Sequence, residues 1–199
     1  MPRVQPRLVL ASASPRRREL LQDLGLDFLC RPVDLDETPL SGESADAYVR
    51  RLARAKAAAA ARKGELVLAA DTIVVRDGQL LGKPADPEEA RTMLASLSGR
   101  DHAVHTGVAV HLPPSTTREA VCRSVVTMAA LSREEIGWYV ATGEPLDKAG
   151  AYAIQGLGAL IVERIDGNYS NVVGLPLPTV YRLFGEVGYD LRGFIASER

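Results

Sequence analysis

The stretch from Leu8 to Leu24, LVLASASPRRRELLQDL, most constrains how this chain can fold. Its apolar run, Val9 to Ala11, is long enough for a buried strand and too short for a helix. Ser14 followed by Pro15 is typical of a helix start, with the serine hydroxyl at the N-cap and proline at the first helical position. The stretch therefore predicts a strand that leads directly into a helix. The apolar face of this helix is predicted to be Leu20, Leu21 and Leu24.

Three arginines, Arg16 to Arg18, fall in the first turn of this predicted helix. Cations are unfavourable there, because the N-terminus of a helix is already partly positive. Free backbone N–H groups, the hydroxyls of Ser12 and Ser14, and the guanidinium groups would together bind an anion, most readily a polyphosphate. The alternative is a solvated basic face, which is the usual environment of a charge run. The position directly after a strand favours the anion site.

Composition limits the classes of function. The 199 residues suit one sizeable domain, or two small lobes that share one core, and the net charge of −1 argues against bulk electrostatic binding of nucleic acid or of an anionic membrane. Cys30 and Cys122 match no metal or redox spacing, which predicts buried thiols in a reducing compartment. The first residues, MPRVQPR, lack the apolar segment of a signal peptide. We therefore expect a cytoplasmic protein with neither a nucleic acid nor a membrane as partner.

Strand and helix signals alternate along the first half of the chain, strands then dominate, and helices return at the end. This pattern predicts an α/β fold with a mixed sheet flanked by helices. The expected strands cover residues 28–33, 66–70, 73–75, 79–81, 103–112, 120–130 and 159–165. The expected later helices cover residues 44–62, 86–98, 132–141 and 179–186. The glycine-rich segment 143–159 is a long loop without regular structure in this prediction, and such loops are usually functional.

Two charged residues fall in otherwise apolar surroundings. Lys56 lies on the apolar stripe of the predicted helix over 44–62, where its amine either extends to the edge of that face or reaches a buried anion. Asp71 follows the buried strand over 66–70, at the carboxyl end where α/β sheets place ligands. A carboxylate there can activate water or bind a divalent metal. The alternative for Asp71 is a cap for the hairpin that follows.

Further acids and bases complete a set suited to phosphate-ester hydrolysis. Asp36 and Glu37 also follow a predicted strand, and Lys83 follows the predicted hairpin. Cations offset charge on phosphate oxygens, while a carboxylate and a bound Mg²⁺ prepare the attacking water. The sequence therefore predicts chemistry on a phosphate ester.

Five segments, taken in order, resemble the Maf (septum-formation-associated) proteins, and together they extend over almost the whole chain. They are LASASPRR over 10–17, Ala70-Asp71-Thr72, Gly82-Lys83-Pro84, DKAGAYAIQG over 147–156 and VGLP over 173–176. The resemblance implies an elongated α/β fold similar to that of inosine-triphosphate pyrophosphatase. It implies a single domain over 1–199, with two lobes and a nucleotide cleft between them.

The same resemblance implies an activity. Maf proteins are nucleoside triphosphate pyrophosphatases that use a divalent metal, Mg²⁺ or Mn²⁺, to cleave between the α- and β-phosphates. A homodimer is an expectation at the level of the family. The implied purpose is to remove noncanonical nucleotides, including modified pyrimidines, before they enter nucleic acids, with a link to the arrest of cell division.

The resemblance also implies roles for single residues. Asp71 is the expected proton acceptor and, with Glu37, a metal ligand; whether Asp36 or Glu37 is that ligand stays open. The positions expected to handle phosphate and metal are Ser12, Arg16, Glu37, Lys56 and Lys83.

Three positions separate two branches of the family. Arg17, Thr72 and Gln155 match the branch that acts on dTTP and UTP rather than the branch that acts on 7-methyl-GTP. Gln155 offers a donor and an acceptor to the polar edge of a pyrimidine, and Thr72 adds a small hydroxyl. The prediction is a dTTP/UTP pyrophosphatase. Its alternatives are a nucleotide-binding regulator of septum formation with little catalysis, and a pyrophosphatase directed at 7-methyl-GTP or another purine.

Overall fold

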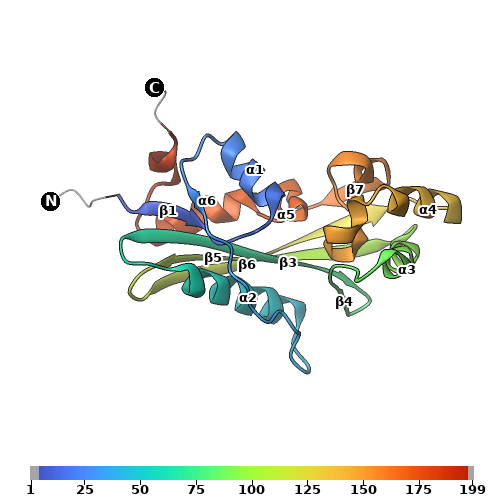
Figure 1. Ribbon diagram of the computed structural model, residues 1–199, viewed down its shortest axis with the longest axis horizontal. Coiled ribbons are helices and arrows are strands. Elements are labelled where there is room, and N and C mark those ends of the chain that lie inside the picture. The colour runs from blue at the N-terminus through green and yellow to red at the C-terminus, as the bar shows by residue number, and fades with distance from the viewer. Residues whose placement is uncertain (1–4, 197–199) are drawn as a thin grey trace. The chain divides into compact units, whose positions relative to one another are not determined.

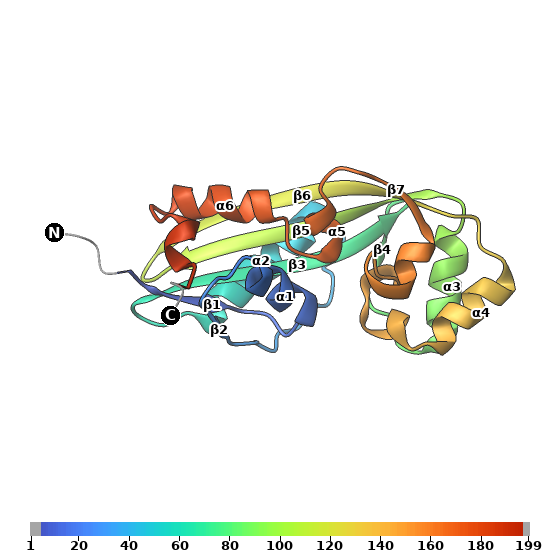
Figure 2. The ribbon, with the colours of Figure 1, turned by 90° about the horizontal axis from the view of Figure 1, so that it is seen from above.

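The computed structural model describes residues 5–196, and seven of their strands form one sheet (Figures 1 and 2). The strand order is β2-β1-β3-β5-β6-β7, and β4 pairs with β3 outside this path. β1 runs parallel to β2 and β3, whereas the β3–β4 and β6–β7 pairs are antiparallel. The predicted α/β fold with a mixed sheet flanked by helices is confirmed. The predicted domain over 1–199 includes residues 1–4 and 197–199, which lie outside the described residues.

The bounds of the elements follow the predictions most closely for the helices. The strands are β1 (Arg7–Leu10), β2 (Leu29–Cys30), β3 (Glu65–Arg76), β4 (Gln79–Leu81), β5 (Asp101–Leu112), β6 (Thr116–Met128) and β7 (Val162–Asp166). The α-helices are α1 (Pro15–Asp23), α2 (Ala45–Ala60), α3 (Pro87–Leu97), α4 (Arg133–Ala141), α5 (Tyr169–Val173) and α6 (Leu177–Glu186). Short 3₁₀-helices cover Glu144–Asp147, Ala149–Ala151, Gly156–Leu160 and Leu191–Phe194. The segment 143–159 thus contains local regular structure, which the prediction missed. The prediction also missed the short helix α5.

The chain divides into two compact units. Unit 1 comprises Met1–Asp71, Thr106–Cys122 and Gly174–Arg199, and unit 2 comprises Thr72–His105 and Arg123–Val173. The strands β3, β5 and β6 each pass from one unit into the other. The two lobes with a nucleotide cleft between them stay a prediction. No helix within residues 5–196 is both long enough and apolar enough to cross a membrane.

Unit 1 has a buried core on each face of its sheet. Along β3, Leu66, Leu68 and Ala70 belong to one apolar cluster, while Val67 and Ala69 belong to another. This alternation is expected, because successive side chains of a strand point to opposite faces. The first cluster includes residues of α1 and α6, and the second includes residues of α2 (Figure 1). Both faces of β3 are thus covered in unit 1.

Helix α1 begins where the sequence predicts, but two details of the prediction are wrong. Ser14 is the N-cap residue and Pro15 the first helical residue, yet the Ser14 side chain makes no capping hydrogen bond. The hydroxyl of Ser12 instead accepts from the Ser14 backbone N–H at 3.2 Å. Leu21 is fully buried, whereas Leu24 is 40% exposed because the helix ends at Asp23 and Leu24 leaves its apolar face.

In unit 2, α3 and α4 pack together over a separate apolar core (Figure 2). The hairpin predicted at Asp77-Gly78 is confirmed, because Arg76 of β3 pairs with Gln79 of β4. Asp86 caps α3 by accepting from the backbone N–H groups of Glu88 and Glu89. Ser132 and Glu135 form the capping box of α4. These local signals fix the helix starts as the sequence predicts.

Helix α2 packs directly on the backbone of β5, and Gly107 makes this close approach sterically feasible. A Cβ atom built at Gly107 would lie 2.2 Å from the carbonyl oxygen of Val49. We predict that Gly107→Ala pushes α2 off the sheet and lowers the free energy of unfolding by about 1–3 kcal/mol. Urea unfolding monitored by circular dichroism measures this loss.

The matched control is Gly137→Ala in α4. A Cβ there meets no atom within 4 Å, and alanine favours a helix over glycine by about 1 kcal/mol. The control variant should therefore be at least as stable as the parent. Equal stability of the Gly107→Ala variant and the parent would contradict the close packing of α2 on β5.

Candidate active site

The ammonium group of Lys56 lies between two carboxylates in unit 1. Its Nζ atom is 2.6 Å from Oδ1 of Asp71 and 2.5 Å from Oε1 of Glu37. Lys56 is 9% exposed and Asp71 is 6% exposed, whereas the Glu37 side chain is 51% exposed. Of the two environments predicted for Lys56, the structure therefore shows the buried anion. The cluster opens to solvent on its Glu37 side.

Asp71 lies within β3, and its predicted place at the end of a strand is wrong. β3 continues to Arg76, because the β-branched residues from Thr72 to Val75 extend the strand into the hairpin with β4. Asp71 follows Val67 and Ala69 at alternate positions, so its side chain points to the face that α2 covers. The turn of the hairpin is at Asp77-Gly78, which excludes the alternative that Asp71 caps it. The structure thus gives an acid on the α2 face of the sheet.

Burial changes the acidity of Asp71. Removal from water raises the pKa of its carboxyl group above the ordinary value, and the charge of Glu37 acts in the same direction. The charges of Lys56 and Arg17 lower that pKa but do not cancel the effect of burial. A carboxylate with a raised pKa accepts a proton more readily, as a general base requires.

The guanidinium of Arg17 binds three oxygen atoms of the protein itself. Nε donates to the carbonyl oxygen of Gly174 at 2.7 Å, and Nη1 donates to the carbonyl oxygen of Ala70 at 2.7 Å and to Oγ of Ser12 at 3.3 Å. Burial lowers the pKa of Arg17, while the charge of Asp71 raises it. Arg17 thus connects α1 to the residue that precedes Asp71. The solvated basic face is wrong for Arg17, whereas Arg18 is exposed as that alternative predicts.

The other residues predicted to bind phosphate in unit 1 lie around the start of α1. Ser12 is 8% exposed, and its hydroxyl contacts both the Ser14 backbone and Arg17. Arg16 lies in the first turn of α1 and is partly buried. The anion site at this turn stays a prediction.

Tyr48, which the sequence analysis missed, holds the loop that carries Glu37. Its hydroxyl donates to the carbonyl oxygen of Glu37 at 2.9 Å. A signal for it exists, because Tyr48 precedes Lys56 by eight residues on α2 and so lies on the same helix face. Asp36 instead binds Thr38: its Oδ1 accepts from the Thr38 backbone N–H at 2.9 Å, and hydrogen bonds from the side chain and the backbone of Thr38 lower its pKa. Glu37 rather than Asp36 therefore contacts Lys56.

Three predicted residues belong to unit 2. Thr72 follows Asp71 in β3 and is partly buried, Lys83 is exposed after β4, and Gln155 is partly buried before a 3₁₀-helix. The backbone N–H of Gly150 donates to the carbonyl oxygen of Gly82 at 3.0 Å, which connects the Lys83 segment to the 143–160 region. Contacts of these residues with a nucleotide stay predictions.

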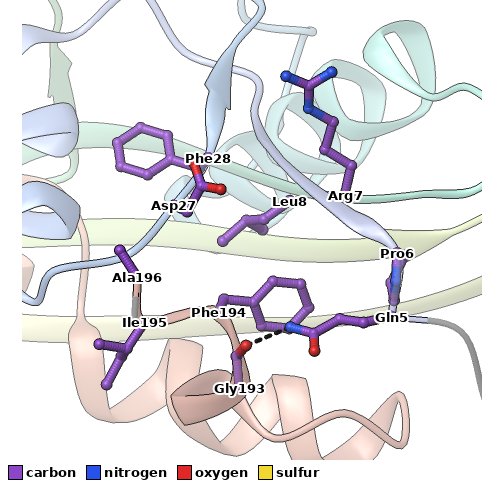
Figure 3. A pocket seen from close by; sticks show the side chains of 10 residues that line it. All are labelled: Gln5, Pro6, Arg7, Leu8, Asp27, Phe28, Gly193, Phe194, Ile195 and Ala196. Atoms are coloured by element: carbon purple, nitrogen blue, oxygen red, sulfur yellow. Dashed lines mark hydrogen bonds between the residues drawn. The ribbon is translucent and has the colours of Figure 1, made fainter. Parts of the chain in front are cut away.

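A pocket elsewhere in unit 1 is lined by residues near both ends of the described chain (Figure 3). It encloses about 270 Å³ between the Gln5–Leu8 segment, Asp27-Phe28 and residues 193–196. None of the predicted site residues lines it. The candidate active site is therefore the Lys56 cluster and not this pocket.

The fold and this cluster define a class of protein: an α/β protein with a mixed sheet, in which a buried ammonium joins two carboxylates beside an arginine-rich helix start. Residues 7–187 match the Maf family, described as Maf-like protein. The chain therefore belongs to the Maf family.

Named relatives match over nearly their whole length. A protein of Anaeromyxobacter sp. named dTTP/UTP pyrophosphatase is 56% identical, and the match covers 93% of this chain and 91% of that protein. A protein of Myxococcus xanthus with the same name is 54% identical, with 94% and 95% covered. The solved Ham1 protein of Staphylococcus aureus is 15% identical with a TM-score of 0.46 over 95% of this chain and 93% of that one. This last likeness is too weak to support an argument.

The geometry of Arg17 makes a first prediction about the site. Lysine keeps the charge but lacks the planar fork that reaches the carbonyl oxygens of both Ala70 and Gly174. We expect Arg17→Lys to lower the free energy of unfolding by about 1–3 kcal/mol, because a buried carbonyl loses its donor. Thermal and urea unfolding measure this loss. Arg18→Lys, an exposed substitution on the same helix, is the control and should leave stability unchanged.

The pairing of Lys56 with Asp71 predicts that the stability loss of Lys56→Met depends on pH. Without the ammonium the pKa of Asp71 rises further, so the folded variant binds a proton that the unfolded chain releases. The variant should lose about 3 kcal/mol at neutral pH, and the loss should shrink as the pH falls toward about 4. Urea unfolding between these pH values tests this, with the exposed Lys63→Met as control. A deficit that is independent of pH would contradict the pairing of Lys56 with Asp71.

Proposed function

We propose that this chain hydrolyses dTTP and UTP to the monophosphate and pyrophosphate. The observation that carries the proposal is the Lys56–Asp71–Glu37 cluster, which lies in a chain whose near-full-length relatives are named dTTP/UTP pyrophosphatase. Arg17, Thr72 and Gln155 support the pyrimidine branch, because the family resemblance implies that these three positions differ between the two branches. The substrate class is therefore a pyrimidine nucleoside triphosphate.

The residues of the cluster suit a divalent cation. Asp71 Oδ1 and Glu37 Oε1 converge on one positive charge, that of Lys56, and carboxylate oxygens are the donors that Mg²⁺ and Mn²⁺ prefer. Within residues 5–196, no group of three His, Cys, Asp or Glu side chains could hold a metal ion. Two carboxylates supplemented by phosphate oxygens and water are a common Mg²⁺ environment. We propose Glu37 and Asp71 as the ligands; a metal bound there would polarise the phosphate oxygens and the attacking water.

The protein's own groups account for the proton and the charges. Asp71 takes a proton from the water whose oxygen attacks the α-phosphorus, and its raised pKa suits this role. The bond from the α-phosphorus to the oxygen that bridges to the β-phosphorus breaks, and pyrophosphate leaves with that oxygen. The positive charges of Arg16, Lys56 and Lys83 stabilise the phosphate oxygens as negative charge develops. Arg17 acts through Ser12 and the Ala70 backbone, which it holds in place.

The wider role follows from the proposed substrate. We propose that the protein acts in the cytoplasm on free nucleotides, that it removes modified pyrimidine nucleotides, and that it thereby bears on cell division. A homodimer stays a prediction at the level of the family. A regulator with little catalysis and a 7-methyl-GTP-directed enzyme are the two outcomes that would replace this proposal.

Replacement of Asp71 tests the mechanism. Asp71→Asn keeps the shape of the side chain but removes the proton acceptor, so we expect turnover to fall by at least about 100-fold with little change in nucleotide affinity. Release of pyrophosphate from dTTP and UTP, with and without Mg²⁺, measures turnover, and calorimetry measures binding. Asp34→Asn, an exposed substitution in the Glu37 loop, is the control.

Two results would contradict the proposal. Unchanged turnover in Asp71→Asn would remove Asp71 from the mechanism. Preference of the parent protein for 7-methyl-GTP, or binding of nucleotides without pyrophosphate release, would replace the proposed activity by one of its alternatives.

A further inference from the structure

The carboxylate of Glu144 in unit 2 accepts three hydrogen bonds from donors of its own chain. Oε1 accepts from the hydroxyl of Tyr139 at 2.8 Å and from the backbone N–H of Gly158 at 2.9 Å. Oε2 accepts from the backbone N–H of Leu157 at 3.1 Å. One side chain therefore binds the backbone of the segment that follows Gln155.

Tyr139 extends this network to the residues before Gln155. Its hydroxyl donates to Glu144 and also accepts from the backbone N–H of Ala153 at 3.1 Å. Tyr139 is 1% exposed, so its phenol is fixed in the core of unit 2. The segment 153–158 is thus fastened at both ends to one Tyr139–Glu144 pair, with Gln155 between the two attachments.

Two glycines leave room for this attachment. Gly156 has a φ of +66°, and a Cβ atom there would lie 2.6 Å from Oε2 of Glu144. A Cβ atom at Gly158 would lie 2.1 Å from the carbonyl oxygen of Ala153 and 2.6 Å from the hydroxyl of Tyr139. The backbone therefore packs so closely around the carboxylate that neither position accepts a side chain without displacement.

The charge state of Glu144 agrees with this role. Burial alone raises the pKa of its carboxyl group, but the hydrogen bonds from Tyr139, Gly158 and Leu157 outweigh burial, and the net pKa is lowered. The group is thus an ionised acceptor at neutral pH, and hydrogen bonds to an ionised acceptor are stronger than neutral ones.

We propose that Glu144 and Tyr139 are positioning residues that hold the Gln155 segment in one conformation and thereby set the selectivity for the base. This inference rests on the proposed function and on the expectation from the sequence that the Gln155 amide contacts the edge of the pyrimidine. A side-chain amide discriminates between bases only if its backbone is held, because a mobile donor and acceptor pair accommodates several partners. Neither residue touches the substrate in this proposal.

The test combines Glu144→Gln and Tyr139→Phe, alone and together, with Glu163→Gln as the matched control. Glu163 is an exposed glutamate of β7 in the same unit. In Glu144→Gln, glutamine retains one acceptor oxygen but presents an amide N–H₂ toward a backbone donor. The variant should therefore lose only part of the hydrogen bonding of Glu144. Hydrogen–deuterium exchange of the amides of Ala153, Leu157 and Gly158 gives a readout that needs no activity.

We expect faster exchange at those three amides in both single variants and no change in Glu163→Gln. The KM for dTTP and UTP should rise about tenfold in Glu144→Gln, which corresponds to about 1.4 kcal/mol, with kcat within about twofold. The KM for a purine triphosphate should change little, so the preference for pyrimidines falls. The double variant should lose little more of the preference for pyrimidines than the more affected single variant, because the two side chains act as one unit.

Faster exchange with unchanged selectivity, or an equal rise in KM for the triphosphates of all bases, would overturn the positioning role while leaving the proposed function in place. A parent protein with no preference for pyrimidine triphosphates would overturn the proposed function and this inference with it. The parent's substrate panel separates the two failures, because it is measured before any variant is compared.

Discussion

The pairing of Lys56 with Asp71 is the interaction on which the chemistry proposed for unit 1 depends. An ammonium group and a carboxylate that are both nearly excluded from water are tolerated only as partners, since either alone would carry a large desolvation penalty. Lys56 is carried by α2, and this helix packs on β5 at Gly107 without an intervening side chain. The pair therefore lies between a strand and a helix that packs closely on the sheet.

Features encoded by neighbouring residues could be predicted from the sequence. The helix start at Ser14-Pro15, the hairpin at Asp77-Gly78 and the capping box at Ser132 each depend on a few adjacent residues, and the structure confirms them. The apolar stripe of α2 could also be predicted, since its residues repeat at helical spacing. This pattern correctly placed Lys56 on the buried face of the helix. Local physics was sufficient for these elements.

Features that depend on distant partners could not be predicted in this way. The continuation of β3 past Asp71 could not be predicted from the sequence. It is stabilised by pairing with β4 as much as by the strand propensity of residues 72–75. The sequence also could not show that Arg17 binds the carbonyl oxygen of Gly174, which is 157 positions away along the chain. Family resemblance supplied the expected site residues, but it did not indicate that one of them, Arg17, binds backbone oxygens of its own chain.

Asp71 and Glu144 show how the surroundings of a carboxylate suit it either to chemistry or to holding the backbone. Asp71 and Glu144 carry the same functional group, yet the pKa of Asp71 is raised by burial while that of Glu144 is lowered by its three donors. A carboxylate with a raised pKa can take a proton from water, whereas a carboxylate that accepts several hydrogen bonds stays ionised and acts as a fixed acceptor. Asp71 is therefore suited to chemistry and Glu144 to architecture. The direction of each pKa shift follows from contacts within a single unit of the chain.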